Sequence, residues 1–241
     1  MSHLVQRLEP CVVMIRCLDT GMKGSGFLVT AEGHIATNNH VVSTPTLTGG
    51  ALTVSYSSKI EVTIKGERKP AHLMIDQNAF EPIVYDYALL KVDGVTGSPF
   101  LEVQDLTTVK SGDDVLCLGF PLDFSTLIAT KGIVSAITRR ASHFNTLHQL
   151  TSVVSDALIQ FGNSGGPMVH YDSGKAIGMN TLSHPLQDAL WYRLHKELTN
   201  PAVAQVPALR ELIEYSLKYT MVGLNHAVSL EHLRSDRSWP I

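Results

Sequence analysis

Residues 156–169 read DALIQFGNSGGPMV and surround one serine, Ser164, with glycines at positions 162, 165 and 166. Glycines let the backbone turn tightly and bring amide groups close to a bound carbonyl oxygen. We expect an oxyanion hole built from Gly162, Asn163 and Ser164, with the N–H groups of Gly162 and Ser164 converging on that oxygen. Because a plain turn rarely needs three glycines around a serine, the stretch predicts a nucleophile.

A serine hydroxyl is too weak an acid to ionise at neutral pH, so it needs a neighbouring base. Two other segments supply candidates: GSGFLVTAEGHIATNNHVV (24–42) contains His40, and YDYALLKV (85–92) contains Asp86. A buried carboxylate that accepts the proton of one ring nitrogen holds an imidazole in one tautomer. Each residue alone also fits a structural role. Together, the order His, Asp, Ser predicts a catalytic triad in the chymotrypsin order rather than the subtilisin or α/β-hydrolase order.

Short apolar runs separated by Gly, Pro and Ser fill the first two-thirds of the chain. Runs such as CVVMIRCL, KIEVTIKG and GIVSAIT are rich in Val, Ile and Thr, and several alternate apolar with polar residues. This spacing is typical of antiparallel sandwiches and barrels. The polar stretch 102–114 is the candidate linker, so we expect one unit over 1–105 and a second over 106–241.

Residues 184–220 break this β pattern and predict a pair of helices. Pro185 suits a helix start and Asn200-Pro201 suits its end. Between them, leucines recur every fourth position, on one helical face: Leu186, Leu190, Leu194 and Leu198. A second helical segment begins at Pro207. The pair is expected either to pack on the second unit as an insertion, or to act as a lid or docking site for a regulatory protein.

Composition narrows the class of protein. The 241 residues are 44% hydrophobic and 17% charged, which suits a globular protein with a sizeable core. The net charge of −3 argues against a dedicated nucleic-acid binder, and no window approaches the run of about 20 apolar residues that spans a bilayer. The eleven histidines include no HExxH and no zinc-type Cys/His cluster, so we expect no metal and no other cofactor.

The cysteines and the N-terminus indicate a compartment. Cys11, Cys17 and Cys117 lie in apolar runs and form no CxxC, so we expect buried free thiols in a reducing environment. The first residues, MSHLVQRLEPCVVMIRC, lack the apolar core and cleavage site of a signal peptide. We therefore expect a cytoplasmic protein.

Several segments together resemble the HtrA/Deg group of trypsin-like serine proteases. Residues 24–42 resemble the group's histidine segment and 156–169 its serine segment. GDDVLCLGFP and TKGIVSAI resemble the first strands of its second barrel, and GKAIGMNT and GLNHAVSLEHL its last strands and closing helix. The resemblance implies an all-β fold of two six-stranded antiparallel barrels, here with a two-helix insertion. His40 and Asp86 would come from the first barrel and Ser164 from the second, with the triad in the cleft between them.

The resemblance also implies a serine endopeptidase that binds a protein or peptide substrate and forms an acyl-enzyme, with no nucleic-acid or membrane partner. Its primary specificity pocket would be lined by Ile159 and by Thr181, Leu182 and Ser183, a strand that pairs with the substrate backbone. Ile159 and Leu182 favour a small or medium uncharged residue before the scissile bond, although both also fit ordinary core packing. No acidic residue in 158–161 would select Lys or Arg.

Two departures from the group affect assembly: the sequence to Ile241 leaves no room for a PDZ domain, and MSHLVQRLEP has no counterpart of the aromatic trimer-forming arm. Two other functions remain open. One is a protein-binding module that keeps the scaffold without turnover, although no triad residue is missing. The other is a serine esterase or acyltransferase, whose usual mark is a GxSxG elbow with the serine before the histidine.

Overall fold

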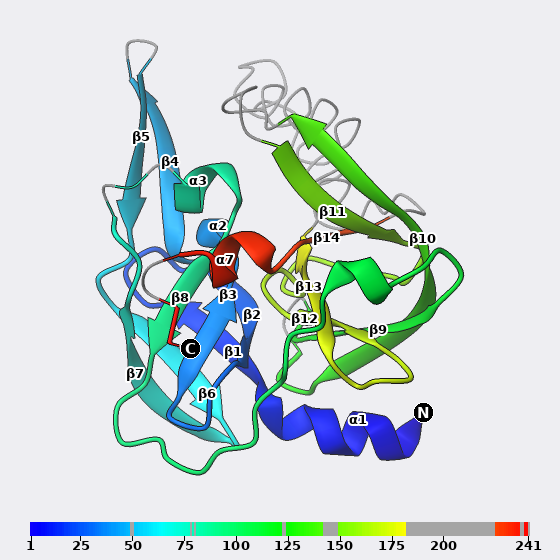
Figure 1. The fold of residues 1–241 in the computed structure, drawn as a ribbon. Coiled ribbons are helices and arrows are strands. Elements are labelled where there is room, and N and C mark those ends of the chain that lie inside the picture. Colours follow the sequence, from blue (N-terminus) through cyan, green and yellow to red (C-terminus); the bar gives the residue numbers. More distant parts are fainter. Residues whose placement is uncertain are drawn as a thin grey trace, which may run out of the picture.

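The structure is a computed structural model that describes residues 1–48, 51–77, 79, 81–121, 124–141, 149–181, 225–236 and 239–240. Its described part consists mainly of two closed antiparallel barrels of six strands each, which confirms the predicted fold class (Figure 1). The predicted helices at 184–220 lie outside the described residues.

The first barrel has the strand order β1-β2-β3-β8-β7-β6 and is closed by the pairing of β1 with β6. Its sequence alternates as a half-buried strand should: along β6, Ile60, Val62 and Ile64 are buried and the residues between them are partly exposed. The strands are β1 (Val12–Cys17), β2 (Lys23–Leu28), β3 (His34–Thr37), β6 (Ile60–Ile64), β7 (Glu67–Leu73) and β8 (Ala88–Lys91).

The second barrel has the order β10-β11-β14-β13-β12-β9 and is closed by the pairing of β9 with β10. The strands are β9 (Asp114–Gly119), β10 (Ile128–Ala141), β11 (Gln149–Ser155), β12 (Pro167–His170), β13 (Ala176–Thr181) and β14 (Asn225–Val228). The predicted boundary at residue 105 falls in the connection between β8 and β9, so each barrel uses strands from one side of it.

A hairpin and several short helices lie outside the two barrels. A two-stranded hairpin, β4 (Ser43–Thr48) and β5 (Ala51–Tyr56), projects beyond the first barrel in Figure 1. The helices are α1 (Ser2–Leu8), α2 (Asn39–Val42), α3 (Glu81–Val84) and α7 (Glu231–Arg234), with 3-10 turns at η1 (Glu9–Cys11) and η2 (Leu106–Thr108). None of the described helices is long and apolar enough to cross a membrane.

Apolar packing runs from one barrel into the other. One cluster of buried side chains contains Phe27 and Leu90 of the first barrel together with Leu116, Leu118 and Met179 of the second. A smaller cluster fills only the second barrel. The barrels are therefore joined by a continuous apolar core, which fixes how residues from one stand against residues from the other.

The three cysteines are buried free thiols in the structure. Burial raises the pKa of the Cys11 thiol to about 11 and also raises that of Cys117. Thiols of this kind stay protonated at neutral pH, so they are poor nucleophiles and behave as small apolar side chains.

Candidate active site

His40 and Asp86 lie side by side in the first barrel. His40 belongs to the single turn α2 that follows β3, and Asp86 comes directly before Tyr87 and β8. The Nδ1 atom of His40 is 3.0 Å from both carboxylate oxygens of Asp86, and the His40 main-chain N–H donates to Oδ1 at 3.1 Å. One carboxylate therefore holds both the ring and the backbone of the histidine.

The backbone of Asp86 is in the left-handed region, with φ of +52°. This conformation costs most residues roughly 1–2 kcal/mol, although aspartate tolerates it better than others. The side chain of Asn38, two residues before the histidine, donates from Nδ2 to the Asp86 carbonyl oxygen at 2.9 Å. Asn38 therefore connects the aspartate turn to the histidine turn. The sequence, in which Asn38 and Asn39 simply precede His40, did not predict this role.

Thr181, at the end of β13, brings the second barrel to this pair. Its hydroxyl lies 3.4 Å from Oδ2 of Asp86 and is a long donor to it. The sequence placed Thr181 only in the substrate-pairing strand. The structure adds a contact with Asp86 from the opposite barrel.

The electrostatic setting of His40 follows from these contacts. Burial by itself lowers the pKa of the imidazole, whereas the charge of Asp86 and its hydrogen bond both raise it, and the net pKa lies above the ordinary value. The side chain of His40 is 43% exposed and that of Asp86 26% exposed, so water limits the burial penalty and the effect of Asp86 on the pKa of His40 prevails.

The turn before Ser164 presents two amide groups. Asn163 donates its N–H to the carbonyl of Gln160 at 2.9 Å, and Gly162 between them has φ of +97°, as the third residue of a type II turn requires. Because the N–H of Asn163 is used within the turn, it is not available to a bound oxygen. In the part of the chain that the structure describes, the N–H groups of Gly162 and Ser164 have no acceptor, which leaves these two as the candidate oxyanion donors.

The serine turn packs directly on the segment that carries the histidine. A Cβ placed on Gly24 would lie 2.7 Å from the Val41 side chain and 3.2 Å from the carbonyl oxygen of Ser164. A Cβ on Gly165, whose φ is +83°, would overlap the Thr37 hydroxyl. Glycines at these positions allow the two barrels to approach each other closely where the three predicted triad residues come from.

Ser164 itself is 6% exposed. Among described residues its hydroxyl makes no hydrogen bond, so it is not bonded to the His40 ring here. Contacts between a nucleophile and its base are often loose until substrate binds. The structure thus brings the His40–Asp86 pair together and places Ser164 on the adjoining turn.

The predicted pocket residues are only partly described. Ile159 is completely buried within the apolar cluster of the second barrel, while its neighbours Leu158 and Phe161 are 48% and 39% exposed. Leu182 and Ser183 lie outside the described residues, as does the predicted regulatory segment 184–220. A specificity pocket built from these residues therefore stays a prediction.

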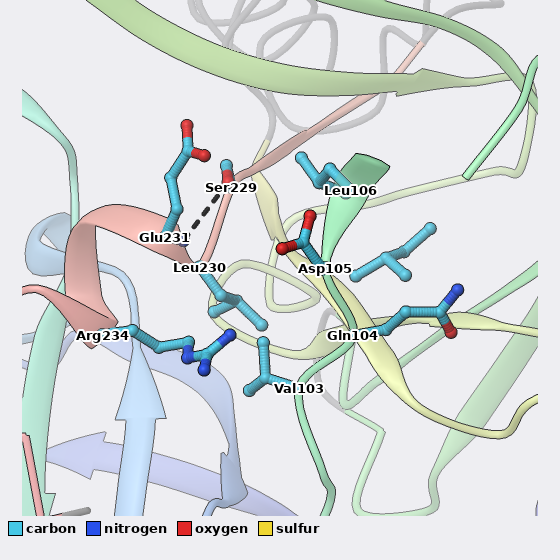
Figure 2. Close-up of a pocket in the computed structure, with 9 residues that line it drawn as sticks. Val103, Gln104, Asp105, Leu106, Ser229, Leu230, Glu231 and Arg234 are labelled. Carbon is cyan, nitrogen blue, oxygen red and sulfur yellow. Dashed lines mark hydrogen bonds between the residues drawn. The ribbon is translucent and has the colours of Figure 1, made fainter. Parts of the chain in front are cut away.

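A small pocket elsewhere is lined by none of the predicted triad residues. It lies between the chain around η2 and the segment of β14 and α7, with Asp105 and Leu230 among its lining residues (Figure 2). The Glu231 main-chain N–H donates to the Ser229 hydroxyl at its rim, at 3.2 Å. Its lining groups carry no paired base and nucleophile. Across the described ranges, no group of three or more His, Cys, Asp or Glu side chains could hold a metal ion.

Comparison with known proteins gives a consistent picture. The model of the trypsin-like peptidase domain matches residues 24–179. The mitochondrial serine protease HTRA2 of Drosophila pseudoobscura pseudoobscura is 34% identical over 164 residues, covering 68% of this chain and 34% of that protein. A probable periplasmic DegP-like serine endoprotease of Chlamydia pneumoniae is 32% identical over 161 residues, covering 66% of this chain and 28% of that protein.

Solved structures agree. The HtrA-type protease AlgW with a tripeptide has a TM-score of 0.59 and 30% identity, covering 75% of this chain and 54% of that one. An inactive form of Rv3671c from M. tuberculosis H37Rv has a TM-score of 0.64 over 97% of this chain, and at 17% identity it shows the fold alone. The chain spans about a third of the length of the curated relatives it matches. The predicted resemblance is confirmed: the chain belongs to the trypsin-like serine peptidases, and its relatives are HtrA-type proteases.

Proposed function

We propose that this chain is a serine endopeptidase that hydrolyses peptide bonds of protein substrates, with Ser164 as nucleophile, His40 as general base and Asp86 as its orienting carboxylate. The observation that carries the proposal is that the Asp86 carboxylate accepts hydrogen bonds from both the ring and the main chain of His40. Because the carboxylate accepts from Nδ1 at 3.0 Å, the ring's Nε2 is the nitrogen that can accept a proton.

The proposed reaction proceeds in two halves. Ser164 Oγ attacks the carbonyl carbon of the scissile bond while its proton passes to His40 Nε2, and the carbonyl oxygen becomes an oxyanion. The N–H groups of Gly162 and Ser164 stabilise that charge. His40 then gives the proton to the leaving amine as the C–N bond breaks. Water, deprotonated by the same nitrogen, then attacks the acyl-enzyme carbonyl, and His40 returns that proton to Ser164 Oγ as the ester bond breaks and the acid product leaves.

For specificity, we propose a small or medium uncharged residue before the scissile bond. The segment 158–161, which would line the pocket, carries no acidic side chain, and a cation buried there without a partner would cost several kcal/mol. The solved structure of the HtrA-type protease AlgW contains a tripeptide, so a relative of this chain binds a peptide. Cleavage of a random peptide library tests the proposal, and a profile dominated by Lys or Arg would contradict it.

Labelling with a fluorophosphonate tests the function directly. Wild-type protein is expected to be labelled at Ser164 and to cleave a quenched fluorescent peptide. Ser164→Ala is expected to lose both, with turnover lower by roughly 10⁶ and an unchanged circular dichroism spectrum. A wild-type protein that folds yet is neither labelled nor active would favour the protein-binding module, and turnover of esters alone would favour the esterase.

A regulatory role for 184–220, with a partner protein or a lid, is proposed from the leucine pattern alone. Replacing 185–219 by a short Gly/Ser linker tests it. A shortened enzyme with the same rate and the same peptide preference would show that the segment is structural. The cytoplasmic location likewise stays a prediction.

A further inference from the structure

Ser25 of β2 reaches from the first barrel into the serine turn of the second. Its side chain is completely buried. The hydroxyl donates to the carbonyl oxygen of Gly162 at 2.6 Å and accepts from the main-chain N–H of Phe120 at 2.8 Å. Its own main-chain N–H donates to the carbonyl oxygen of Ser164, also at 2.8 Å. One residue of the first barrel therefore binds the end of β9 and two carbonyls that flank the candidate oxyanion donors.

These contacts fix two peptide groups of the turn. The peptide between Gly162 and Asn163 is held at its oxygen by the Ser25 hydroxyl and at its nitrogen by Gln160. The peptide after Ser164 is held at its oxygen by the Ser25 N–H and at its nitrogen by the carbonyl of Asn180, at 3.0 Å. The Ser164 N–H lies between these two fixed peptides, and the Gly162 N–H belongs to the peptide directly before the first of them.

The hydrogen bonds of Ser25 hold the turn at Gly162, the residue whose backbone has the most conformational freedom there. Gly162 reaches φ of +97° without steric cost but is equally free to leave it. Rotation of the peptide before Gly162 would convert the type II turn to type I and turn the Gly162 N–H away. Because the Ser25 hydroxyl fixes the next peptide, between Gly162 and Asn163, the Phe161–Gly162 peptide can flip only by opposite rotations about the bonds on its two sides, with no shift of the turn to assist it.

We propose that Ser25 is a positioning residue for the oxyanion hole: its hydroxyl holds the Gly162 turn in the conformation that presents the Gly162 and Ser164 amides. The proposal rests on the proposed peptidase function and assigns Ser25 no chemistry of its own. It makes the first barrel a contributor to transition-state stabilisation as well as the source of the base.

The test compares Ser25→Ala with a matched control, Ser57→Ala. The Ser57 hydroxyl is also buried, donates to Asp19 at 2.5 Å and accepts from the Lys59 N–H at 3.3 Å, but it touches no part of the serine turn. Misplacement of a catalytic group by about 1 Å can cost roughly 10² in rate. We therefore expect Ser25→Ala to lower kcat about 10²-fold while KM changes less than about threefold.

A peptide boronic acid supplies the second readout, because its adduct with Ser164 mimics the tetrahedral intermediate whereas a simple product peptide does not. Ser25→Ala should lose affinity for the boronate by a factor close to the loss in kcat and should keep its affinity for the product peptide. The control should keep both. A Ser25→Ala kcat within about threefold of the control, or a lower kcat with unchanged boronate affinity, would overturn the proposal.

Two further measurements keep the test decisive. If Ser25→Ala does not fold, Ser25→Cys replaces it, since a thiol is a weaker donor of similar shape, and the same outcomes apply. A crystal structure of the variant shows the conformation of the Gly162 turn directly, whether or not the enzyme is active. If Gly162 keeps φ near +97° and Asn163 still donates to Gln160 in the variant, Ser25 is not what positions the turn. This conclusion holds even if the wild type proves to have no peptidase activity.

Discussion

Substitution of Asp86 by asparagine offers the sharpest test of the site, because it changes hydrogen-bonding character while keeping shape. The carboxylate faces three donors: the His40 main-chain N–H, the His40 Nδ1–H and the Thr181 hydroxyl. An asparagine offers one acceptor oxygen and one NH₂ group. Its NH₂ group needs an acceptor, and His40 Nδ1, which lies 3.0 Å from both Asp86 oxygens, becomes one when it loses its proton.

The magnitude follows from that tautomer. With Nδ1 accepting, the ring proton sits on Nε2, which can then no longer take the proton of Ser164. In the analogous triad the same exchange lowers kcat by about 10⁴, equivalent to about 5.4 kcal/mol of transition-state stabilisation. The Asn38 bond goes to the main-chain carbonyl of Asp86, so the turn itself should be kept.

The assay is kcat/KM on a quenched fluorescent peptide, with unfolding by urea measured in parallel. Wild type and variant should unfold at similar urea concentrations while their kcat/KM values differ by about four orders of magnitude. A folded Asp86→Asn enzyme that retains more than about a tenth of wild-type activity would refute the assignment of Asp86 as the orienting carboxylate.

Three other outcomes are expected. Since the pKa of His40 is raised and its neutral form is the base, kcat/KM should fall as pH decreases, with a midpoint above about 6.5; a midpoint well below 6 in the pH–rate profile would contradict this. Gly165→Ala should lower the free energy of unfolding by roughly 3 kcal/mol in urea titrations, because the new Cβ meets positive φ and the carbonyl of Ser25. Tyr87→Phe should cost about 1–3 kcal/mol in the same assay, since its hydroxyl donates to Asp236 at 2.5 Å, and an unchanged midpoint would show that this bond adds nothing.

The sequence predicted the elements that local pattern controls. Alternating residues such as Ile60, Val62 and Ile64 specify a half-buried strand, and glycines around Ser164 specify a tight turn, so both can be read without tertiary information. The closure of two six-stranded barrels came from resemblance, because strand order depends on contacts between residues distant in sequence.

The residues that support the site were not predictable in this way. Asn38 and Ser25 look in sequence like ordinary polar residues beside apolar runs, and their roles depend on which carbonyls the fold brings to them. The positive φ of Asp86 likewise has no local signal, since the preceding and following residues are tyrosines that suit a strand. The roles of such positions become visible only when the fold brings residues distant in sequence next to them.

Each end of the described chain lies against the barrel formed by the other half of the sequence: the N-terminal helix against the second barrel, and the C-terminal segment against the first (Figure 1). Helix α1 lies against the β12–β13 turn of the second barrel, where a Cβ on Gly174 would overlap the Arg7 guanidinium. In return, the segment after α7 crosses to the first barrel, where Asp236 meets Tyr87 and Trp239 packs on the shared cluster. If the protein were cut at the connection between β8 and β9, each fragment would carry a terminal segment that binds the other fragment. Each would also expose the apolar side chains that the two barrels share in the intact protein. Such halves should reassemble on mixing and regain function together, as a split enzyme does, with neither half stable alone.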